Sequence, residues 1–283
     1  MRPIEMSSDP NTTPRTQNSD TSATTMMQQT ALFLMYHRVA PGGPASYPYT
    51  VTPQRFKEQL DVVAAVEASR DESPLPCGLT FDDGHESNYD PAMALLATSR
   101  RKARFFVTAG WIGTRVGFMR WPQVKELLEA GHLVGSHGWS HKNLTRCSEE
   151  ELQVELSRSK NELEQRLGRS IESISMPGGR WNARVLRACA EFGYRQVFTS
   201  DPETVIRFRE GIQILPRFIA TQSLTASRLR RLLRTGNHLL YSARLAHQAK
   251  EAIRWSLGDK LYHRVWCLLS GWKCDEESTV PLK

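Results

Sequence analysis

Two short clusters of polar residues in this 283-residue sequence have the types and spacing needed for metal-assisted acid–base chemistry. The first is Asp82-Asp83-Gly84, and the second is a pair of histidines, His137 and His141. Adjacent carboxylates repel each other unless they share a proton or a cation, and histidines four residues apart can bind one metal ion. Two histidines and one aspartate leave a coordination position open for water, as catalytic zinc sites do. The second aspartate can then accept the proton of that water.

The segments between these clusters predict how the chain positions them. Short apolar runs typical of strands occur at residues 31–36, 75–81, 104–108, 132–136, 171–176, 196–199 and 212–215. Helical patterns separate them at residues 53–66, 90–101, 121–130, 148–168 and 182–193. This alternation predicts a parallel sheet with helices outside it. Its six or seven units favour a barrel over a doubly wound sheet, and in either fold both polar clusters follow strands and lie on the active face.

The composition predicts a globular protein without a membrane span. Apolar residues make up 40% of the chain and charged residues 24%, which argues against wholesale disorder. No apolar run reaches the length of a transmembrane helix, and the first thirty residues contain no apolar signal-peptide core. None of the five cysteines has CxxC spacing, so the pattern indicates a reducing, cytoplasmic environment.

The net charge of +7 is concentrated near the C-terminus. Residues 221–273 contain ten Lys and Arg against two acidic residues, whereas the rest of the chain is close to neutral. No nucleic-acid motif accompanies this charge, so we expect no nucleic-acid partner. We predict a disordered lead-in (1–30), a catalytic domain (31–220), a basic amphipathic helical extension (221–273) and a tail (274–283). The extension is either a packed helical hairpin with a solvated basic face or a surface that contacts anionic membranes.

The motifs TFDDG at 80–84 and SHGWSH at 136–141, followed by the turn Pro177-Gly178, resemble those of the polysaccharide deacetylases. This family is also known as the NodB-homology family or carbohydrate esterase family 4. The resemblance covers residues 31–220 and implies a distorted (β/α)7-type barrel. It also implies metal-dependent hydrolysis of N-acetyl groups on amino sugars, with zinc or another divalent ion such as Co2+, Ni2+ or Mn2+.

The resemblance assigns roles to individual residues. Asp82 matches the catalytic base, and Asp83, His137 and His141 match the metal ligands. Gly178 matches the position whose backbone N–H binds the oxyanion.

The third motif departs from the family pattern because Ser175 replaces the arginine that supports the base. Arg180 follows in the same loop, and we expect it to supply the missing guanidinium to Asp82, with Arg217 as the next candidate.

The last motif also departs from the pattern, because Leu215-Pro216-Arg217 replaces the expected Leu-x-His. One branch of the family carries this histidine on the first strand as Tyr-His-x-Val, which Tyr36-His37-Arg38-Val39 matches. We therefore expect His37 to be the general acid, because an arginine stays protonated. The fourth family motif, an aspartate followed by a tryptophan, survives only as Asp201, which we expect to orient the His37 ring.

Two tryptophans in the motif loops, Trp139 and Trp181, could stack on sugar rings or pack in the core. The expected substrate is an N-acetylated polysaccharide or its lipid-linked precursor in exopolysaccharide biosynthesis. We expect the protein to act on this substrate in the cytoplasm and to contact the inner face of the membrane peripherally. Two alternatives remain: the same hydrolase acting on a non-sugar amide or ester, and an inactive sugar-binding module. Ser175 and the missing Leu-x-His favour the second.

Overall fold

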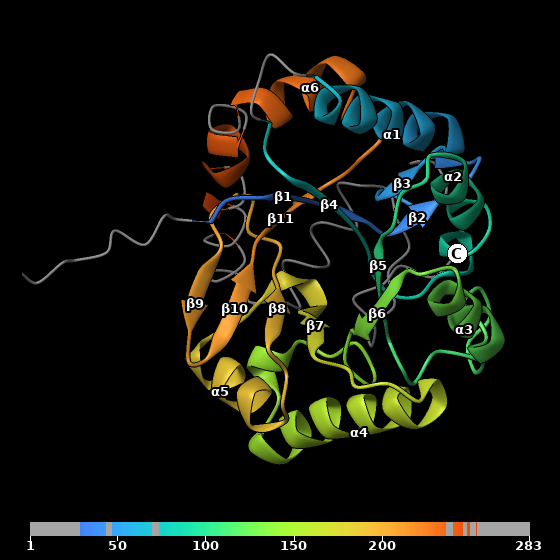
Figure 1. Cartoon of the computed structure of the whole chain (residues 1–283). Coiled ribbons are helices and arrows are strands. Elements are labelled where there is room, and N and C mark those ends of the chain that lie inside the picture. The colour runs from blue at the N-terminus through green and yellow to red at the C-terminus, as the bar shows by residue number, and fades with distance from the viewer. Residues whose placement is uncertain are drawn as a thin grey trace, which may run out of the picture.

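Parallel strands form the centre of the molecule, and helices cover them on the outside (Figure 1). The computed structural model describes residues 29–43, 47–69, 74–235, 240–245, 248–249 and 253. The strands are β1 (Leu32–Tyr36), β2 (Arg38–Val39), β3 (Thr50–Val51), β4 (Cys77–Phe81), β5 (Arg104–Val107), β6 (Leu133–Ser136), β7 (Ser173–Ser175), β8 (Gln196–Phe198), β9 (Arg207–Arg209), β10 (Ile212–Leu215) and β11 (Arg217–Ile219). The helices are α1 (Pro53–Glu67), α2 (Ala92–Thr98), α3 (Trp121–Glu129), α4 (Glu149–Leu167), α5 (Ala183–Glu191) and α6 (Ala226–Thr235).

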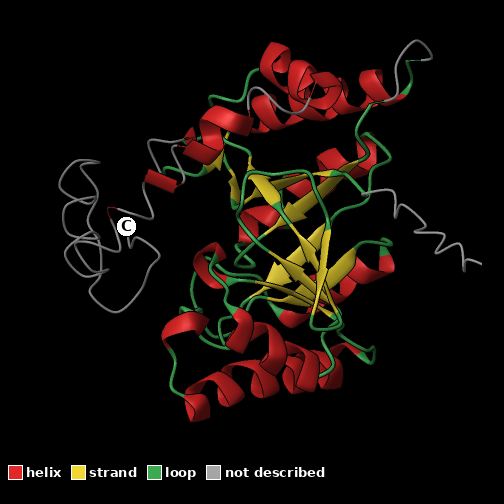
Figure 2. Ribbon diagram, turned by 90° about the vertical axis from the view of Figure 1, so that its left-hand side faces the viewer, coloured by secondary structure: helices red, strands yellow, loops and turns green. Residues whose placement is uncertain are grey.

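The described strands form a nine-stranded sheet in the order β11-β1-β4-β5-β6-β7-β8-β10-β9, and β2 pairs separately with β3. Every pairing is parallel except that of β10 with β9. Figure 2, turned by 90°, shows the strands between helices on opposite sides. The predicted α/β fold with a parallel sheet is therefore confirmed.

The two ends of the parallel series are joined at Pro216, which separates β10 from β11. β10 pairs with β8, while β11 pairs with β1 at the other end of the series. A proline has no N–H to donate to a sheet, so a break at this position is expected. Because the chain passes through this break directly into β11, the last strand lies beside the first. The parallel pairings of β1 with β11 and with β4 bring the ends of these three strands to one rim.

Phenylalanines fill part of the space between the strands. Phe106, Phe198 and Leu215 form a separate buried cluster, against which Phe33 packs. Two positions facing these rings require glycine, because a Cβ at Gly78 would approach the Phe33 ring to 2.4 Å and a Cβ at Gly135 would approach the Phe106 ring to 2.6 Å. Close packing of this kind holds the strands, and hence the residues at their ends, in fixed positions.

The helix boundaries agree with the signals in the sequence. Ser148 and Glu151 form a capping box at the start of α4, and Gly168 ends that helix with a φ of 64°. Asn182 caps α5, as its side chain accepts the Val185 N–H. The predictions missed β11, β9 and the short β2–β3 pair, which contain only two or three residues each.

Only part of the predicted basic extension is described. Its first helix, α6, packs against α1 through the buried Leu229, Leu232 and Leu233. The lead-in before residue 29, most of the extension after α6 and the whole tail 274–283 lie outside the described residues. No helix within the described ranges is both long and apolar enough to cross a membrane.

Candidate active site

The carboxylate pair lies in the turn that follows β4. Asp82 is 2% exposed and Asp83 is 5% exposed. Asp83 has a φ of 73°, and the next residue, Gly84, has a φ of 84°. This left-handed turn is uncommon for a residue other than glycine. Such strain is retained where the surrounding structure enforces it, which functional sites often do.

Asp83 converges with the two histidines that follow β6. Oδ1 of Asp83 lies 3.4 Å from Nε2 of His137 and 3.4 Å from Nε2 of His141. The ligand atoms of all three buried residues lie within 4.8 Å of one another. Burial opposes ionisation of Asp83, but the two imidazoles outweigh it and hold the pKa of this carboxyl well below its usual value.

The donor set of this cluster fits a divalent metal ion. Nδ1 of His137 lies 3.0 Å from the carbonyl oxygen of Ser175, which can only accept, so Nδ1 carries the proton. Nε2 of His137 faces Asp83 and offers its lone pair to a metal ion when the ring is neutral, as in metal-binding histidines oriented by a backbone carbonyl. Oδ1 of Asp83 is buried and has no hydrogen-bond partner among the described residues. A carboxylate and two imidazoles suit zinc and similar transition metals.

The loop that carries His141 is held by Glu155 of α4, a buried residue that the sequence did not single out. Its carboxylate accepts hydrogen bonds from the backbone N–H groups of Trp139 (2.8 Å) and Ser140 (2.9 Å), and from the Ser140 hydroxyl. On the other side, the Trp111 ring stacks on His141 with a centroid distance of 5.2 Å. These contacts fix His141 in its left-handed conformation, with a φ of 64°.

Arg217 holds Asp82. Its Nη1 lies 2.6 Å from Oδ1 and its Nη2 lies 2.8 Å from Oδ2, so the ion pair is bidentate and fully buried. The Ser175 hydroxyl donates to Oδ2 of Asp82 (3.0 Å) and accepts from Nη2 of Arg217 (2.7 Å). Burial would raise the pKa of Asp82, but Arg217 and His137 outweigh this effect and hold it below its usual value.

The prediction that Arg180 supports Asp82 is therefore wrong. The guanidinium comes from Arg217 on the last strand, where its Nε also donates to the carbonyl oxygen of Thr199 (3.0 Å). The residue that replaces the family arginine, Ser175, joins the same hydrogen-bond network. The one sequence signal for this arrangement is that Arg217 occupies the position of the expected histidine.

His37 directly follows β1, at the rim that also carries Asp82 and Asp83. Its ring stacks on Tyr49 with a centroid distance of 5.2 Å, and its carbonyl oxygen accepts a hydrogen bond from Asn88 (2.8 Å). Burial lowers the pKa of His37, and the charges of Asp83 and Asp82 oppose this effect. The histidine therefore lies within electrostatic reach of both aspartates.

The expected pairing of Asp201 with His37 is not present. Nδ1 of His37 is buried without a hydrogen-bond partner among the described residues. Oδ2 of Asp201 instead accepts hydrogen bonds from Nε1 of Trp181 (3.1 Å) and from the Thr199 hydroxyl (2.9 Å). Asp201 thus positions a tryptophan of the third motif loop.

The remaining predicted residues lie in the loops around the cluster. Trp139 is half-buried, its ring lies close to Gly110, and the Arg158 guanidinium lies 3.8 Å from its ring centroid. Trp181 is half-buried and packs against the core. Gly178 is exposed, and a Cβ at this position would contact nothing within 4 Å, so the space around it is open.

We expect His137→Ala and His141→Ala each to lose bound metal, because two remaining ligands hold a catalytic ion poorly. Elemental analysis after dialysis measures the metal content. His85→Ala is a matched control, since the His85 ring packs on Phe118 and is not part of the cluster. Full metal content in His141→Ala would show that His141 is not a ligand.

Comparisons with known proteins agree with this geometry. The family model described as polysaccharide deacetylase matches residues 70–197. YxkH of Bacillus subtilis (strain 168), a protein named after the same family, is 28% identical over 223 residues, which cover 75% of this chain and 79% of YxkH. The peptidoglycan-N-acetylmuramic acid deacetylase PdaA from the same strain is 30% identical over 125 residues, or 43% of this chain and 45% of PdaA. The latter match thus spans less than half of that relative.

Solved structures share the fold. The Streptococcus pyogenes deacetylase PplD, in complex with acetate, superposes with a TM-score of 0.65 at 22% identity, covering 73% of this chain and 99% of PplD. IcaB from Ammonifex degensii superposes with a TM-score of 0.58 at 23% identity, covering 71% of this chain and 97% of IcaB. The family model, these relatives and this fold identify residues 70–197 as a polysaccharide deacetylase domain, of the kind found in hydrolases that act on carbon–nitrogen bonds other than peptide bonds.

Proposed function

We propose that this protein removes N-acetyl groups from an amino-sugar polysaccharide or its lipid-linked precursor and releases acetate. The observation that carries the proposal is the convergence of Asp83, His137 and His141 beside an ionised Asp82. The names of relatives such as PdaA support the same chemistry on an amino sugar.

Zinc, or another divalent ion such as Co2+, Ni2+ or Mn2+, would be held by Asp83, His137 and His141. Such an ion supplies Lewis-acid chemistry, because it lowers the pKa of water and polarises the acetyl carbonyl.

The protein's own residues complete the reaction. Asp82 accepts the proton of the attacking water, and its ion pair with Arg217 keeps it ionised for that step. The Gly178 N–H donates a hydrogen bond to the developing oxyanion. His37 donates a proton to the leaving amine, which would otherwise leave poorly. Burial lowers the pKa of His37, whereas the charges of Asp83 and Asp82 favour its protonated form.

The alternative of an inactive sugar-binding module loses its main support. It rested on Ser175 in place of an arginine and on the absent Leu-x-His. The Arg217 guanidinium replaces that arginine beside Asp82, and His37 lies at the same rim as the aspartates.

The experiment that tests the proposed function is mass spectrometry of candidate substrates incubated with the metal-loaded full chain. Chitooligosaccharides, N-acetylated peptidoglycan fragments, simple amides and acetyl esters are compared under one condition. We expect loss of an acetyl group and release of acetate from the sugar substrates. Turnover confined to the non-sugar amides or esters would contradict the proposed substrate class.

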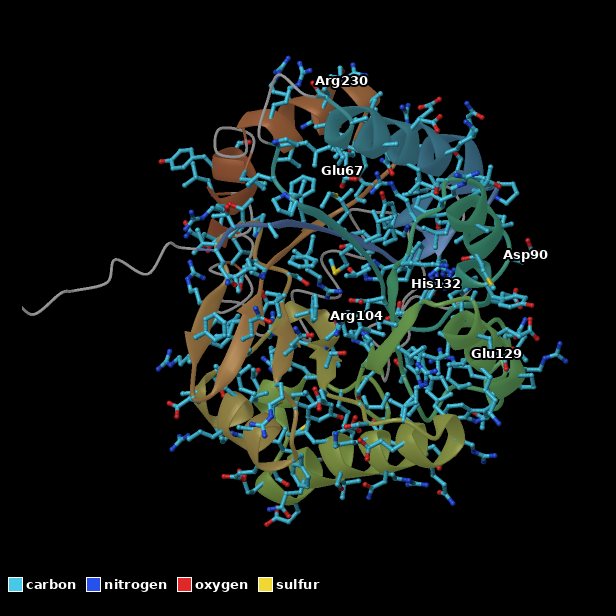
Figure 3. The ribbon with its side chains drawn as sticks, viewed as in Figure 1. Glu67, Asp90, Arg104, Glu129, His132 and Arg230 are labelled. Atoms are coloured by element: carbon cyan, nitrogen blue, oxygen red, sulfur yellow. The ribbon has the colours of Figure 1, made fainter. Side chains whose placement is uncertain are left out.

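We also propose that the basic extension contacts the anionic inner face of the membrane. In α6 the leucines pack against α1, and the exposed side carries Arg228, Arg230, Arg231 and Arg234. Arg230 extends outward from this helix in Figure 3. Since the described apolar face of α6 is buried, the contact would be electrostatic rather than by insertion.

We expect the full chain to co-sediment with anionic vesicles at low salt and to be released at high salt. Each basic residue near an anionic surface adds roughly 1 kcal/mol, so Arg228→Gln combined with Arg230→Gln should weaken binding by about 30-fold. Vesicles of neutral lipid are the control. Equal sedimentation of wild type with neutral and anionic vesicles, or none with either, would contradict the contact.

A further inference from the structure

We propose that Arg38 and Arg115 form a binding site for an oxyanion of the substrate, so that the enzyme acts on N-acetylated sugars that carry a phosphate or a carboxylate. This inference rests on the proposed function and adds the charge class of its substrate. It follows from two arginines beside the candidate metal cluster whose guanidinium groups bind no carboxylate.

Arg38 follows His37 and begins β2. Its guanidinium lies 4.3 Å from the ring centroid of the buried Tyr47, which holds it by a cation–π contact. The Tyr47 ring in turn packs edge-on against Tyr49, on which His37 stacks. Arg38 is therefore fixed beside the candidate general acid by a continuous group of aromatic rings.

Arg115 lies in the loop between β5 and α3. Its guanidinium is 4.4 Å from the ring centroid of Trp111 and 5.2 Å from that of Phe118. Trp111 also stacks on the candidate metal ligand His141, so this one ring contacts both Arg115 and the metal cluster. Aromatic contacts thus hold both arginines in place without neutralising them.

The two arginines are also close enough to affect each other. Arg115 and Asp83 are both among the charges that act on Arg38, and burial lowers the pKa of Arg38. The Asp83 carboxylate is engaged by two histidines and would be a metal ligand, so it does not neutralise the pair. The exposed Glu86 also lies within electrostatic reach of Arg38 but forms no ion pair with it.

Among the described residues, neither guanidinium forms a hydrogen bond or an ion pair. Other partly buried arginines differ, since Arg55, Arg101 and Arg184 each bind a carboxylate. Two like charges held near each other repel, and an anion between them would remove this repulsion. The planar guanidinium fork matches the oxygens of a carboxylate or a phosphate, and half-burial makes such a bond stronger than in water.

The test measures binding of small sugars to the metal-free full chain by calorimetry. The probes are N-acetylglucosamine, which is neutral, N-acetylmuramic acid, which carries a carboxylate, and N-acetylglucosamine 1-phosphate. We expect at least one anionic probe to bind about tenfold more tightly than the neutral one, as a charge-assisted hydrogen bond is worth this factor. Whichever of the two anionic sugars binds more tightly identifies the oxyanion, carboxylate or phosphate, that the site accepts.

The variants are Arg38→Gln, Arg115→Gln and their combination. Arg187→Gln on the exposed side of α5 is the matched control, since its guanidinium only bonds to its own helix. We expect each site variant to reduce the preference for the anionic probe, the combination to abolish it, and the control to retain it. Because Arg115 lies in a surface loop, its variant tests the site even if Arg38→Gln folds poorly.

Equal binding of neutral and anionic probes to the wild type, or a preference that survives in the double variant, would overturn the inference. Acetate release from the same probes is measured in parallel with metal-loaded protein. Release without any anionic preference defeats this inference and leaves the proposed function intact. An arginine-dependent preference without release from any acetylated sugar supports the anion site and defeats the proposed function.

Discussion

We expect His37→Ala to lower kcat by about 100- to 10,000-fold, the usual contribution of a positioned general acid, while the metal content stays unchanged. An amine leaves the tetrahedral intermediate poorly unless it is protonated, and Arg217, at the position of the expected histidine, cannot serve because a guanidinium stays protonated. His37 lies at the rim with Asp82 and Asp83, whose charges act on its ring. His37 is not among the three residues of the candidate metal cluster, so alanine at this position removes no ligand.

Two further variants separate the loss of a proton donor from the loss of packing. His37→Gln keeps a polar side chain of similar length that cannot titrate, so it should be as inactive as His37→Ala. Tyr49→Leu removes the ring on which His37 stacks and should cost far less. Turnover close to wild type in His37→Ala would exclude this residue as the acid and point to water as the proton source.

The second large effect is expected for Arg217→Met, which leaves the buried Asp82 carboxylate without its cation. Breaking a buried ion pair by removing one partner typically costs about 3–5 kcal/mol in the free energy of unfolding. The pKa of Asp82 should also rise, because Arg217 is the charge that chiefly opposes the effect of burial. A base must be ionised to act, so the acidic limb of the pH–rate profile should move to higher pH.

Chemical denaturation and a pH–rate profile measure these two effects. Combining Arg217→Met with Asp82→Asn removes both charges, so the double variant should be more stable than Arg217→Met alone, although inactive. Arg180→Met tests the rejected sequence prediction and should leave the acidic limb in place. An acidic limb that moves in Arg180→Met and not in Arg217→Met would reverse the assignment.

The sequence predicted the strands and helices that position the site, because each has a local signal. Apolar runs marked β1, β4 and β6, and Ser148 with Gly168 marked the ends of α4. The metal cluster could be predicted because its ligands follow strands that end at one rim. Each of these signals, an apolar run, a helix cap or a motif after a strand, is read from residues that are close together in the sequence.

The partners of these residues were harder to predict, because they come from distant segments: Arg217 was only the second candidate for Asp82, and Glu155 was not singled out. Arg217 reaches Asp82 across 135 positions of sequence, from a three-residue strand that follows a proline. A strand this short has no recognisable periodicity. Glu155 lies in a helix with many exposed acidic residues, and nothing in its local pattern distinguishes a buried carboxylate from a solvated one. Pairing of β11 with β1 after Pro216 creates the first contact, and packing of α4 on the motif loop creates the second.

The most direct test of the central claim compares metal content and acetate release in wild type and Asp82→Asn on one N-acetylated oligosaccharide. Asp82 is proposed as a base rather than a ligand, since its oxygens bind Arg217 and Ser175. The substitution should therefore leave the metal content unchanged and abolish acetate release. Loss of metal from Asp82→Asn, or acetate release at the wild-type rate, would contradict the proposed roles of the two aspartates.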